Sequence, residues 1–204
     1  LQAEFLAESN ILVASVNNIE RFNQIASWGA DNGKTVQEIK TASSAFGVSC
    51  AYQTYQHLGI DRWLAILGAH KLYPHSNLLV VDAGTAVTID VVSDSAEHLG
   101  GWILPGVQTA VSAILKNTTK VFGEKTDITD LTFGQSTEDG LLQGCWGSVV
   151  GGVESAIRLF TKTHSDPKVV FTGGDGEALN MLCDYDSVFH SDLVFHGMNR
   201  YIGS

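Results

Sequence analysis

The chain has 204 residues, of which 44% are hydrophobic and 17% charged, a composition typical of a globular protein that can bury a sizeable core. Its formal net charge of −10 argues against a nucleic-acid backbone or an anionic membrane surface as partner. No apolar run approaches membrane-spanning length, and the first residues lack the basic-then-apolar order of a signal peptide.

The cysteines and histidines predict neither a disulfide framework nor a metal site. Three cysteines, Cys50, Cys145 and Cys183, lie far apart, and no CxxC pair occurs. The seven histidines are scattered without a ligand spacing such as HExxH. Because unpaired cysteines fit a reducing compartment, we expect a cytoplasmic protein.

The start of the chain alternates between strand and helix. Residues 11–16 predict a short buried strand, residues 19–30 carry apolar side chains at helical spacing behind a cap at Asn18, and residues 35–39 predict a second strand. This alternation favours an α/β layer.

The segment from Phe46 to Gly59 has no clear period and contains Tyr52. It predicts an ordered loop or short helix, of the kind that lines functional sites. A clearer helix follows over residues 61–72, and Pro74 stops it.

The most informative stretch is Leu78 to Val92, which predicts a β-hairpin. A continuous apolar run ends at Asp82, and the small residues Gly84 and Thr85 follow. The second strand alternates, with Val87, Ile89 and Val91 pointing one way and Thr88 and Asp90 the other. A carboxylate beside a tight Gly-Thr turn suits a cation and phosphate oxygens, although Asp and Thr can also simply satisfy their own turn.

A third antiparallel strand is predicted over residues 98–103. Its paired glycines, Gly100 and Gly101, indicate a bulge or a close approach by another backbone or a ligand, and Gly106 follows shortly afterwards. Residues 107–115 predict a helix, and residues 116–133 a polar loop.

A long helix is predicted from a cap at Ser136 or Thr137 to about Thr163. Its middle is rich in small residues: Gly144, Gly147, Gly151, Gly152 and Ala156. Because each interior glycine costs about 1 kcal/mol relative to alanine, close packing against another helix, within the chain or across a dimer interface, would explain them.

The last part of the chain again mixes strands and helices. Residues 168–172 predict a buried strand that ends in Gly173 and Gly174. A helix over 178–183, a short strand over 187–190 and a final amphipathic helix over 192–202 complete the chain.

Four short motifs stand in one order: GIDRW at 59–63, DAGTAVTID at 82–90, GGWILPG at 100–106 and TGGD at 172–175. With Tyr52 upstream and Thr137 at a helix start, the set resembles the type III pantothenate kinases of the actin and sugar-kinase superfamily. The resemblance runs from about Ile11 to the C-terminus.

The resemblance implies an α/β fold of two actin-like (ribonuclease H-like) lobes, with mixed sheets flanked by helices. We expect residues 1–75 to form an incomplete first lobe and residues 76–204 the second, with the C-terminal helix packing back on the first. The family is dimeric, so a homodimer with the pantothenate pocket near the subunit interface is also expected.

The resemblance also implies the reaction, which is the ATP-dependent phosphorylation of pantothenate to 4′-phosphopantothenate, the first step towards coenzyme A. By position, Asp61 resembles the general base that takes the proton of the substrate hydroxyl. Without the family, Asp61 reads equally well as a helix N-cap. Arg62 would complement a phosphate or the substrate carboxylate, or else form a surface ion pair.

Further roles follow by position from the family. Asp82 matches the ligand of a monovalent cation, K⁺ or NH₄⁺, and Thr85 and Gly84 match residues at ATP. Gly173 and Gly174 match a loop beside the adenosine. The substrate-binding positions are Tyr52, Gly59, Ile60, Asp61, Arg62 and Thr137, of which Thr137 would otherwise be only a helix cap. Gly100, Gly101 and Gly106 either shape the wall of the site or form a structural bulge.

One departure from the family pattern concerns the phosphates. The family opens with a strand bearing an Asp-x-Gly-Asn turn that grips the ATP phosphates and helps to hold Mg²⁺. No such sequence precedes Ile11, and Asp31-Asn32-Gly33 does not match it in order or context. Either an N-terminal segment has been lost from the sequence or it was never present, and in both cases we expect inefficient catalysis by this polypeptide.

Two rival functions remain. A non-catalytic relative could act as an accessory factor for gene regulation, although intact Asp61, Arg62 and Asp82 count against it. Another small-molecule kinase of the same superfamily is the other alternative.

Overall fold

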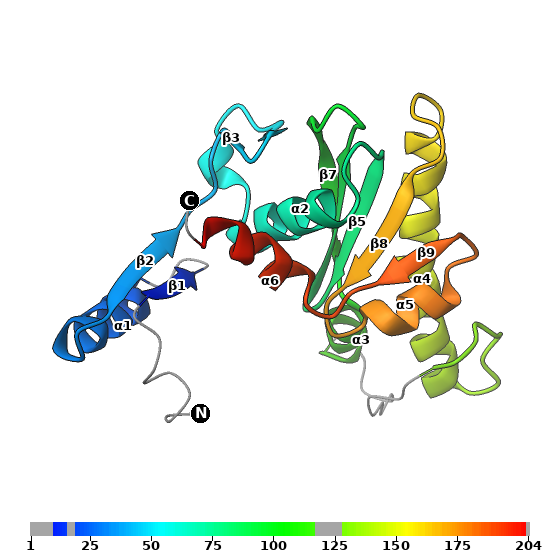
Figure 1. Cartoon of the computed structure of the whole chain (residues 1–204). Helices are drawn as coiled ribbons and strands as arrows, with labels where there is room; N and C mark the ends of the chain where they lie inside the picture. The colour runs from blue at the N-terminus through cyan, green and yellow to red at the C-terminus, as the bar shows by residue number, and fades with distance from the viewer. Residues whose placement is uncertain (1–9, 16–18, 117–127, 203–204) are drawn as a thin grey trace.

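The computed structural model describes residues 10–15, 19–116 and 128–202, and Figure 1 shows their arrangement. The elements in chain order are β1 (Asn10–Ala14), α1 (Ile19–Asp31), β2 (Thr35–Ile39), β3 (Ser44–Ala45), β4 (Val48–Ser49), η1 (Tyr55–His57), α2 (Ile60–Leu72), β5 (Leu78–Ala83), β6 (Ala86–Val92), β7 (His98–Pro105), α3 (Val107–Lys116), α4 (Thr137–Phe160), β8 (Lys168–Thr172), α5 (Gly176–Leu182), β9 (Ser187–Phe189), α6 (Leu193–Met198) and η2 (Asn199–Tyr201). Most of the loop predicted over 116–133 and the cap at Asn18 fall outside the described residues.

The N-terminal elements form a small βαβ unit. β1 and β2 pair in parallel, from Asn10 opposite Thr35 to Ala14 opposite Ile39, and α1 makes the crossover between them. The predicted strand–helix–strand order is therefore confirmed. In Figure 1 this unit lies apart from the larger sheet, beyond the C-terminal helix.

The main sheet has five strands in the order β7-β6-β5-β8-β9. β7, β6 and β5 are antiparallel, whereas β5, β8 and β9 are parallel, so the sheet is mixed. The predicted hairpin is confirmed, and Gly84 and Thr85 form the turn between its strands. The predicted irregularity is confirmed too, because the pairing of β6 with β7 shifts register between Val91 and Val92.

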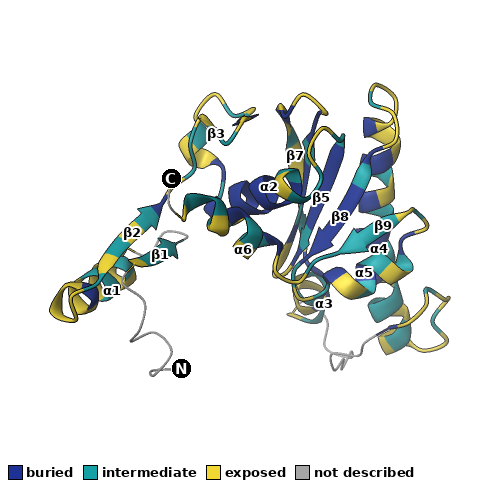
Figure 2. Ribbon diagram, in the orientation of Figure 1, coloured by how far each residue is buried: buried dark blue, intermediate teal, exposed yellow. Residues whose placement is uncertain are grey.

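Two hydrophobic layers cover the two faces of this sheet (Figure 2). On one face α3, α4 and α5 pack against the side chains of Leu79, Val81, Val87, Ile89, Val169 and Phe171. On the other face α2 and α6 pack against Leu78, Val80, Val92 and Val170. The predicted alternation along β6 is confirmed, and it leaves Asp82, Thr88 and Asp90 on the face that α2 covers.

The C-terminal helix α6 crosses α2 closely. Glycine makes this approach possible, since a Cβ on Gly68 would lie 3.1 Å from the backbone nitrogen of Gly197. Arg200, which follows α6, donates hydrogen bonds to the carbonyl oxygens of Leu67 (3.1 Å) and Phe46 (2.9 Å). The C-terminal segment therefore braces α2, while the division at residues 75 and 76 stays a prediction. Within the described part of the chain, no helix has the length and apolar character needed to cross a membrane.

Candidate active site

The DAGT and TGGD motifs meet at one edge of the sheet. Asp82 pairs with Thr172 in the parallel ladder of β5 and β8, so the loops after both strands emerge together. Gly173 has a φ of 88°, and a Cβ there would lie 2.6 Å from Asp82 Oδ1. The backbone N–H of Asp175 donates to the carbonyl of Ala83 (3.0 Å). Only a glycine fits at position 173, because the backbone is left-handed and the two loops touch.

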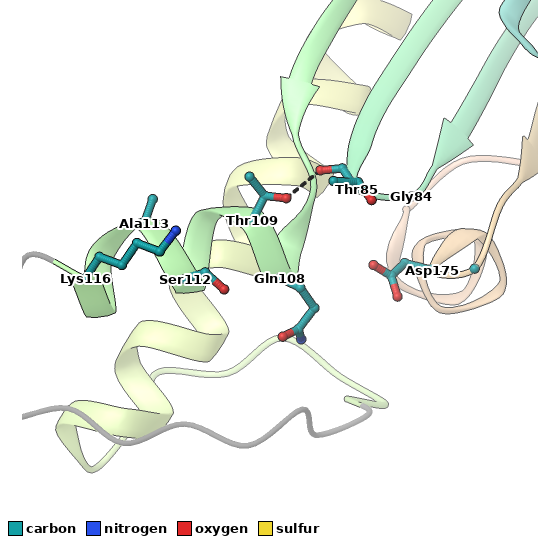
Figure 3. Close-up of a pocket in the computed structure, with 9 residues that line it drawn as sticks. Gly84, Thr85, Gln108, Thr109, Ser112, Ala113, Lys116 and Asp175 are labelled. Carbon is teal, nitrogen blue, oxygen red and sulfur yellow. Dashed lines mark hydrogen bonds between the residues drawn. The ribbon is translucent and has the colours of Figure 1, made fainter. Parts of the chain in front are cut away.

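These loops open onto a cavity of about 690 Å³, shown in Figure 3. Its lining comprises Gly84, Thr85, Gln108, Thr109, Ser112, Ala113, Lys116, Gly174 and Asp175. The cavity thus unites three of the four nucleotide-binding residues predicted from the sequence. The fourth, Gly173, shapes its loop.

One face of α3 supplies five further residues of this cavity, none of which was predicted from the sequence. Thr109 Oγ1 donates to the carbonyl of Thr85 (2.6 Å), which ties α3 to the turn. In Figure 3, Ser112 and Lys116 follow along the helix on the opposite side of the cavity from Asp175. The available signal was the polar spacing Gln108, Ser112 and Lys116, which places these residues on one side of a helix.

Asp61 lies exposed in the first turn of α2 and does not cap the helix. The N-cap is Gly59, and Asp61 Oδ1 accepts a hydrogen bond from the backbone N–H of Arg62 (2.8 Å). The N-cap interpretation is therefore wrong. A Cβ on Gly59 would lie 2.5 Å from Asp61 Oδ1, so glycine there leaves room for the carboxylate. Ile60 is buried and anchors this turn in the core.

The negative charge of Asp61 acts on the carboxyl group of Asp82. Burial raises the pKa of the Asp82 carboxyl above its ordinary value, and the negative charges of Asp61 and Asp90 raise it further. Among the described residues, no ion pair neutralises Asp82, and no cluster of three or more His, Cys, Asp or Glu side chains is arranged to hold a metal ion. A single cation beside Asp82 would relieve this unbalanced charge.

Arg62 forms an ion pair, but the pair is buried and not on the surface. Its guanidinium lies between Asp90 and Tyr52, and Asp90 also contacts His98. Burial alone would lower the pKa of Arg62, but hydrogen bonding and attraction to Asp90 raise it above its usual range. Asp90 and His98 were not predicted as site residues. The signal was an acidic residue on a covered strand face, since a buried carboxylate needs a partner.

A second cavity, of about 720 Å³, is bordered by Gly59 and Ile60 at the start of α2. Its lining includes Glu38 to Thr41 from the end of β2 and Gln56 to Leu58 from the segment before α2. The start of α2 therefore contacts this cavity, while the rest of the helix packs on the sheet.

Thr137 is not brought to these residues within the described chain. It is the first residue of α4, it is exposed, and the cap is Ser136, whose Oγ accepts from the backbone N–H of Asp139 (3.0 Å). α4 packs on the face of the sheet opposite to α2. A site that joins Thr137 to Asp61 would need a second copy of the chain.

Gly100, Gly101 and Gly106 have different roles. Gly100 has a φ of 112° at the irregularity in β7, and Gly101 lies against Arg62 and Asp90. Gly106 packs against the backbone of the Gly84–Thr85 turn, where a Cβ would lie 2.7 Å from the Thr85 carbonyl oxygen. Gly101 and Gly106 thus adjoin residues of the site directly.

The sequence of this chain is similar to proteins named type III pantothenate kinase. The protein from Colwellia psychrerythraea is 33% identical over 207 residues, covering 97% of this chain and 83% of the relative. The protein from Pseudoalteromonas translucida is 35% identical over 195 residues, covering 96% and 82%.

Solved structures share the fold. A protein from Campylobacter jejuni assigned to the Baf family of transcriptional activators matches with a TM-score of 0.61 and 27% identity, over 98% of this chain and 86% of that one. MreB5 of Spiroplasma citri bound to ADP matches with a TM-score of 0.50 and 11% identity, over 98% and 70%. The second likeness concerns the actin-like fold alone. The sequence model of the type III pantothenate kinases matches residues 1–159, most of the chain, and this chain therefore belongs to the type III pantothenate kinase family.

Proposed function

We propose that this protein transfers the γ-phosphoryl group of ATP to the primary hydroxyl of pantothenate, giving 4′-phosphopantothenate for coenzyme A synthesis. The observation that carries the proposal is the joining of the Gly84–Thr85 turn and the Gly174 loop in one cavity, with Asp82 beside the turn and Asp61 close enough to act on Asp82. Family membership supports the choice of substrate.

The proposed roles follow from what phosphoryl transfer requires, which is alignment and neutralisation of charge. ATP would occupy the cavity, with the hydroxyl of Thr85 and the backbone of Gly84 and Gly174 at its polar groups. Asp61, exposed and hydrogen-bonded at one oxygen, would accept the proton of the substrate hydroxyl. Tyr52, Gly59, Ile60 and Arg62 would form the substrate side.

A monovalent cation, K⁺ or NH₄⁺, would be held at Asp82. The partly buried carboxylate and its acidic neighbours fit such an ion, which would supply positive charge beside the nucleotide phosphates. Mg²⁺ would enter with the phosphates of ATP, as is usual for an ion that keeps much of its hydration shell.

Asp82→Asn should stabilise the fold and abolish the response to potassium. The raised pKa means that folding disfavours the charged form, so the penalty is absent below the unfolded value of 3.8 and grows as pH rises through the folded pKa. At pH 7.5 the variant should therefore melt higher, by about 2–4 °C for each kcal/mol gained. Thermal unfolding in KCl and in tetramethylammonium chloride of equal ionic strength measures both effects.

The matched control is Asp94→Asn, an exposed carboxylate in the turn after the same hairpin. It should melt like the unaltered protein and keep the potassium response. If the Asp82→Asn variant were still stabilised by potassium, the cation would not be held at Asp82.

We also propose that the protein is a cytoplasmic homodimer in which Thr137 of one copy reaches the substrate site of the other. Four glycines lie along one side of α4 at spacings of four, three and four residues: Gly140, Gly144, Gly147 and Gly151. A Cβ on any of them would meet nothing within 4 Å among the residues that the structure describes. Such a surface allows another helix to approach closely, which explains glycines that otherwise weaken a helix.

Gly147→Leu should therefore convert the dimer to a monomer without unfolding it. A Cβ at this position meets nothing within 4 Å among the described residues, whereas a leucine side chain would occupy the space of the second copy. Light scattering coupled to gel filtration measures the mass, and circular dichroism the fold. Glu177→Leu, at an exposed position on α5, is the control. A dimer that survives Gly147→Leu would place the interface elsewhere.

A coupled assay of ADP release with pantothenate, with and without potassium, tests the proposed reaction. The second candidate is a regulatory role, which the Baf-family assignment of the Campylobacter jejuni structure favours. In that case Asp61→Asn would leave the cellular function unchanged, and the protein would release no ADP in the assay. Release of ADP that depends on pantothenate supports the kinase.

A further inference from the structure

The positive charge of Arg62 is balanced within the protein by Asp90. Its Nε and Nη2 donate to the two oxygens of Asp90 (2.8 and 2.6 Å), and the two side chains are only 6% and 3% exposed. A bidentate pair of this kind is geometrically fixed and electrically balanced. The remaining Nη1 donates to the hydroxyl oxygen of Tyr52 (3.1 Å). Arg62 can therefore act on a substrate through Tyr52.

His98 also contacts the Asp90 carboxylate of this ion pair. The backbone N–H of Ala51 donates to His98 Nδ1 (3.4 Å), so the ring proton resides on Nε2. Nε2 then donates to Asp90 Oδ1 (3.0 Å). The His98 ring also stacks on that of Tyr52, with centroids 6.1 Å apart and an interplanar angle of 20°. His98 thus contacts both the acid that fixes Arg62 and the ring that Arg62 contacts.

Gly101 in β7 leaves room for the ion pair of Arg62 and Asp90. A Cβ on Gly101 would lie 2.5 Å from Asp90 Oδ1 and 2.8 Å from Arg62 Nη2. A larger residue at this position of the GGW motif would therefore displace the ion pair. Hydrogen bonds at this point join Tyr52 and Arg62 to Asp90 of β6, which lies 28 residues after Arg62.

We propose that Asp90 and His98 are positioning residues of the substrate site, which fix Tyr52 so that its hydroxyl proton is directed to an acceptor oxygen of an acidic substrate. Because Arg62 Nη1 occupies a lone pair of the phenol oxygen, the hydroxyl serves the substrate as a donor. Arg62 transmits the constraint from Asp90, and the stacked His98 sets the plane of the ring. The inference rests on the proposed function, in which pantothenate is the acid.

A double-mutant cycle between Tyr52 and Asp90 tests this inference. The dissociation constant of pantothenate is measured by calorimetry for Tyr52→Phe, for Asp90→Asn and for the double variant. Each single change should weaken binding about 10-fold or more, the effect of losing a hydrogen bond to a charged group. The double variant should be no weaker than Tyr52→Phe alone, because Asp90 acts through the hydroxyl. Binding of a non-hydrolysable ATP analogue should not change.

His98 provides a second test that does not remove the buried acid. His98→Gln keeps a donor for Asp90 and should bind pantothenate within about 3-fold of the unaltered protein, whereas His98→Leu should bind about 10-fold more weakly. Glu97→Gln, at the exposed neighbouring position, is the control. Melting temperatures are recorded for every variant.

The outcomes separate the two proposals. The positioning role would be overturned if the losses of pantothenate affinity in Tyr52→Phe and Asp90→Asn multiplied in the double variant. It would also be overturned if His98→Gln and His98→Leu bound pantothenate equally well. In both cases pantothenate would remain the ligand. An unaltered protein that bound no pantothenate would overturn the proposed function and this inference with it.

Discussion

Asp61→Asn should lower kcat by about 100-fold to 10,000-fold, the usual contribution of a general base, while pantothenate still binds. Asparagine has the shape of aspartate and can accept the same hydrogen bond from the Arg62 N–H, so the start of α2 is kept. Only the ability to take up a proton is lost. Single-turnover formation of ADP measures the chemical step, and calorimetry measures pantothenate binding.

The control for this variant is Asp31→Asn, at the exposed end of α1, which should have the kcat of the unaltered protein. Because the negative charge of Asp61 acts on the position of Asp82, its loss in Asp61→Asn should weaken the binding of a cation there, and the assay is therefore run at saturating potassium. If kcat fell less than 10-fold under these conditions, another group would be the base.

Asp90→Ala should destabilise the protein by about 3–5 kcal/mol, because it leaves the buried Arg62 without its counter-charge. For a chain of this size each kcal/mol corresponds to about 2–4 °C in melting temperature. Denaturant unfolding followed by circular dichroism measures the change. Asp94→Ala, an exposed carboxylate after the same strand, should cost less than about 0.5 kcal/mol.

A double variant distinguishes charge from packing. Combining Arg62→Met with Asp90→Leu removes both buried charges and should recover part of the stability lost in Asp90→Ala. It should not recover pantothenate binding, since Tyr52 would have lost its hydrogen-bond donor. A double variant less stable than Asp90→Ala would mean that the site tolerates no apolar replacement.

Local patterns predicted the central sheet well. The run before Asp82, the Gly-Thr turn and the alternation of β6 each depend on a few neighbouring residues, and the hairpin follows from them. The same alternation placed Asp90 on the face of Thr88. It could not name Arg62 as the partner, because that contact depends on how α2 lies on the sheet.

Other features needed the three-dimensional arrangement. Asp61 looked like a cap because GxD often precedes a helix, but the helix begins one residue earlier, at Ile60. The face of α3 that lines the nucleotide cavity belongs to an ordinary amphipathic helix, and the sequence alone does not show that its polar side faces the Gly174–Asp175 loop after β8. Thr137 was identified only by resemblance, and a single chain leaves it on the far side of the sheet from α2.

The close crossing of α6 over α2 connects the C-terminal helix to the helix that bears Asp61. Leu64 and Leu67 in α2 are fully buried, and the turn that bears Asp61 begins the same helix. Gly68 and Gly197 bring the backbones together, and Arg200 holds α2 to the segment around Phe46. Whatever loosens α6 or the turn that follows it, such as clipping by a protease, will therefore disturb the placement of a carboxylate encoded far upstream.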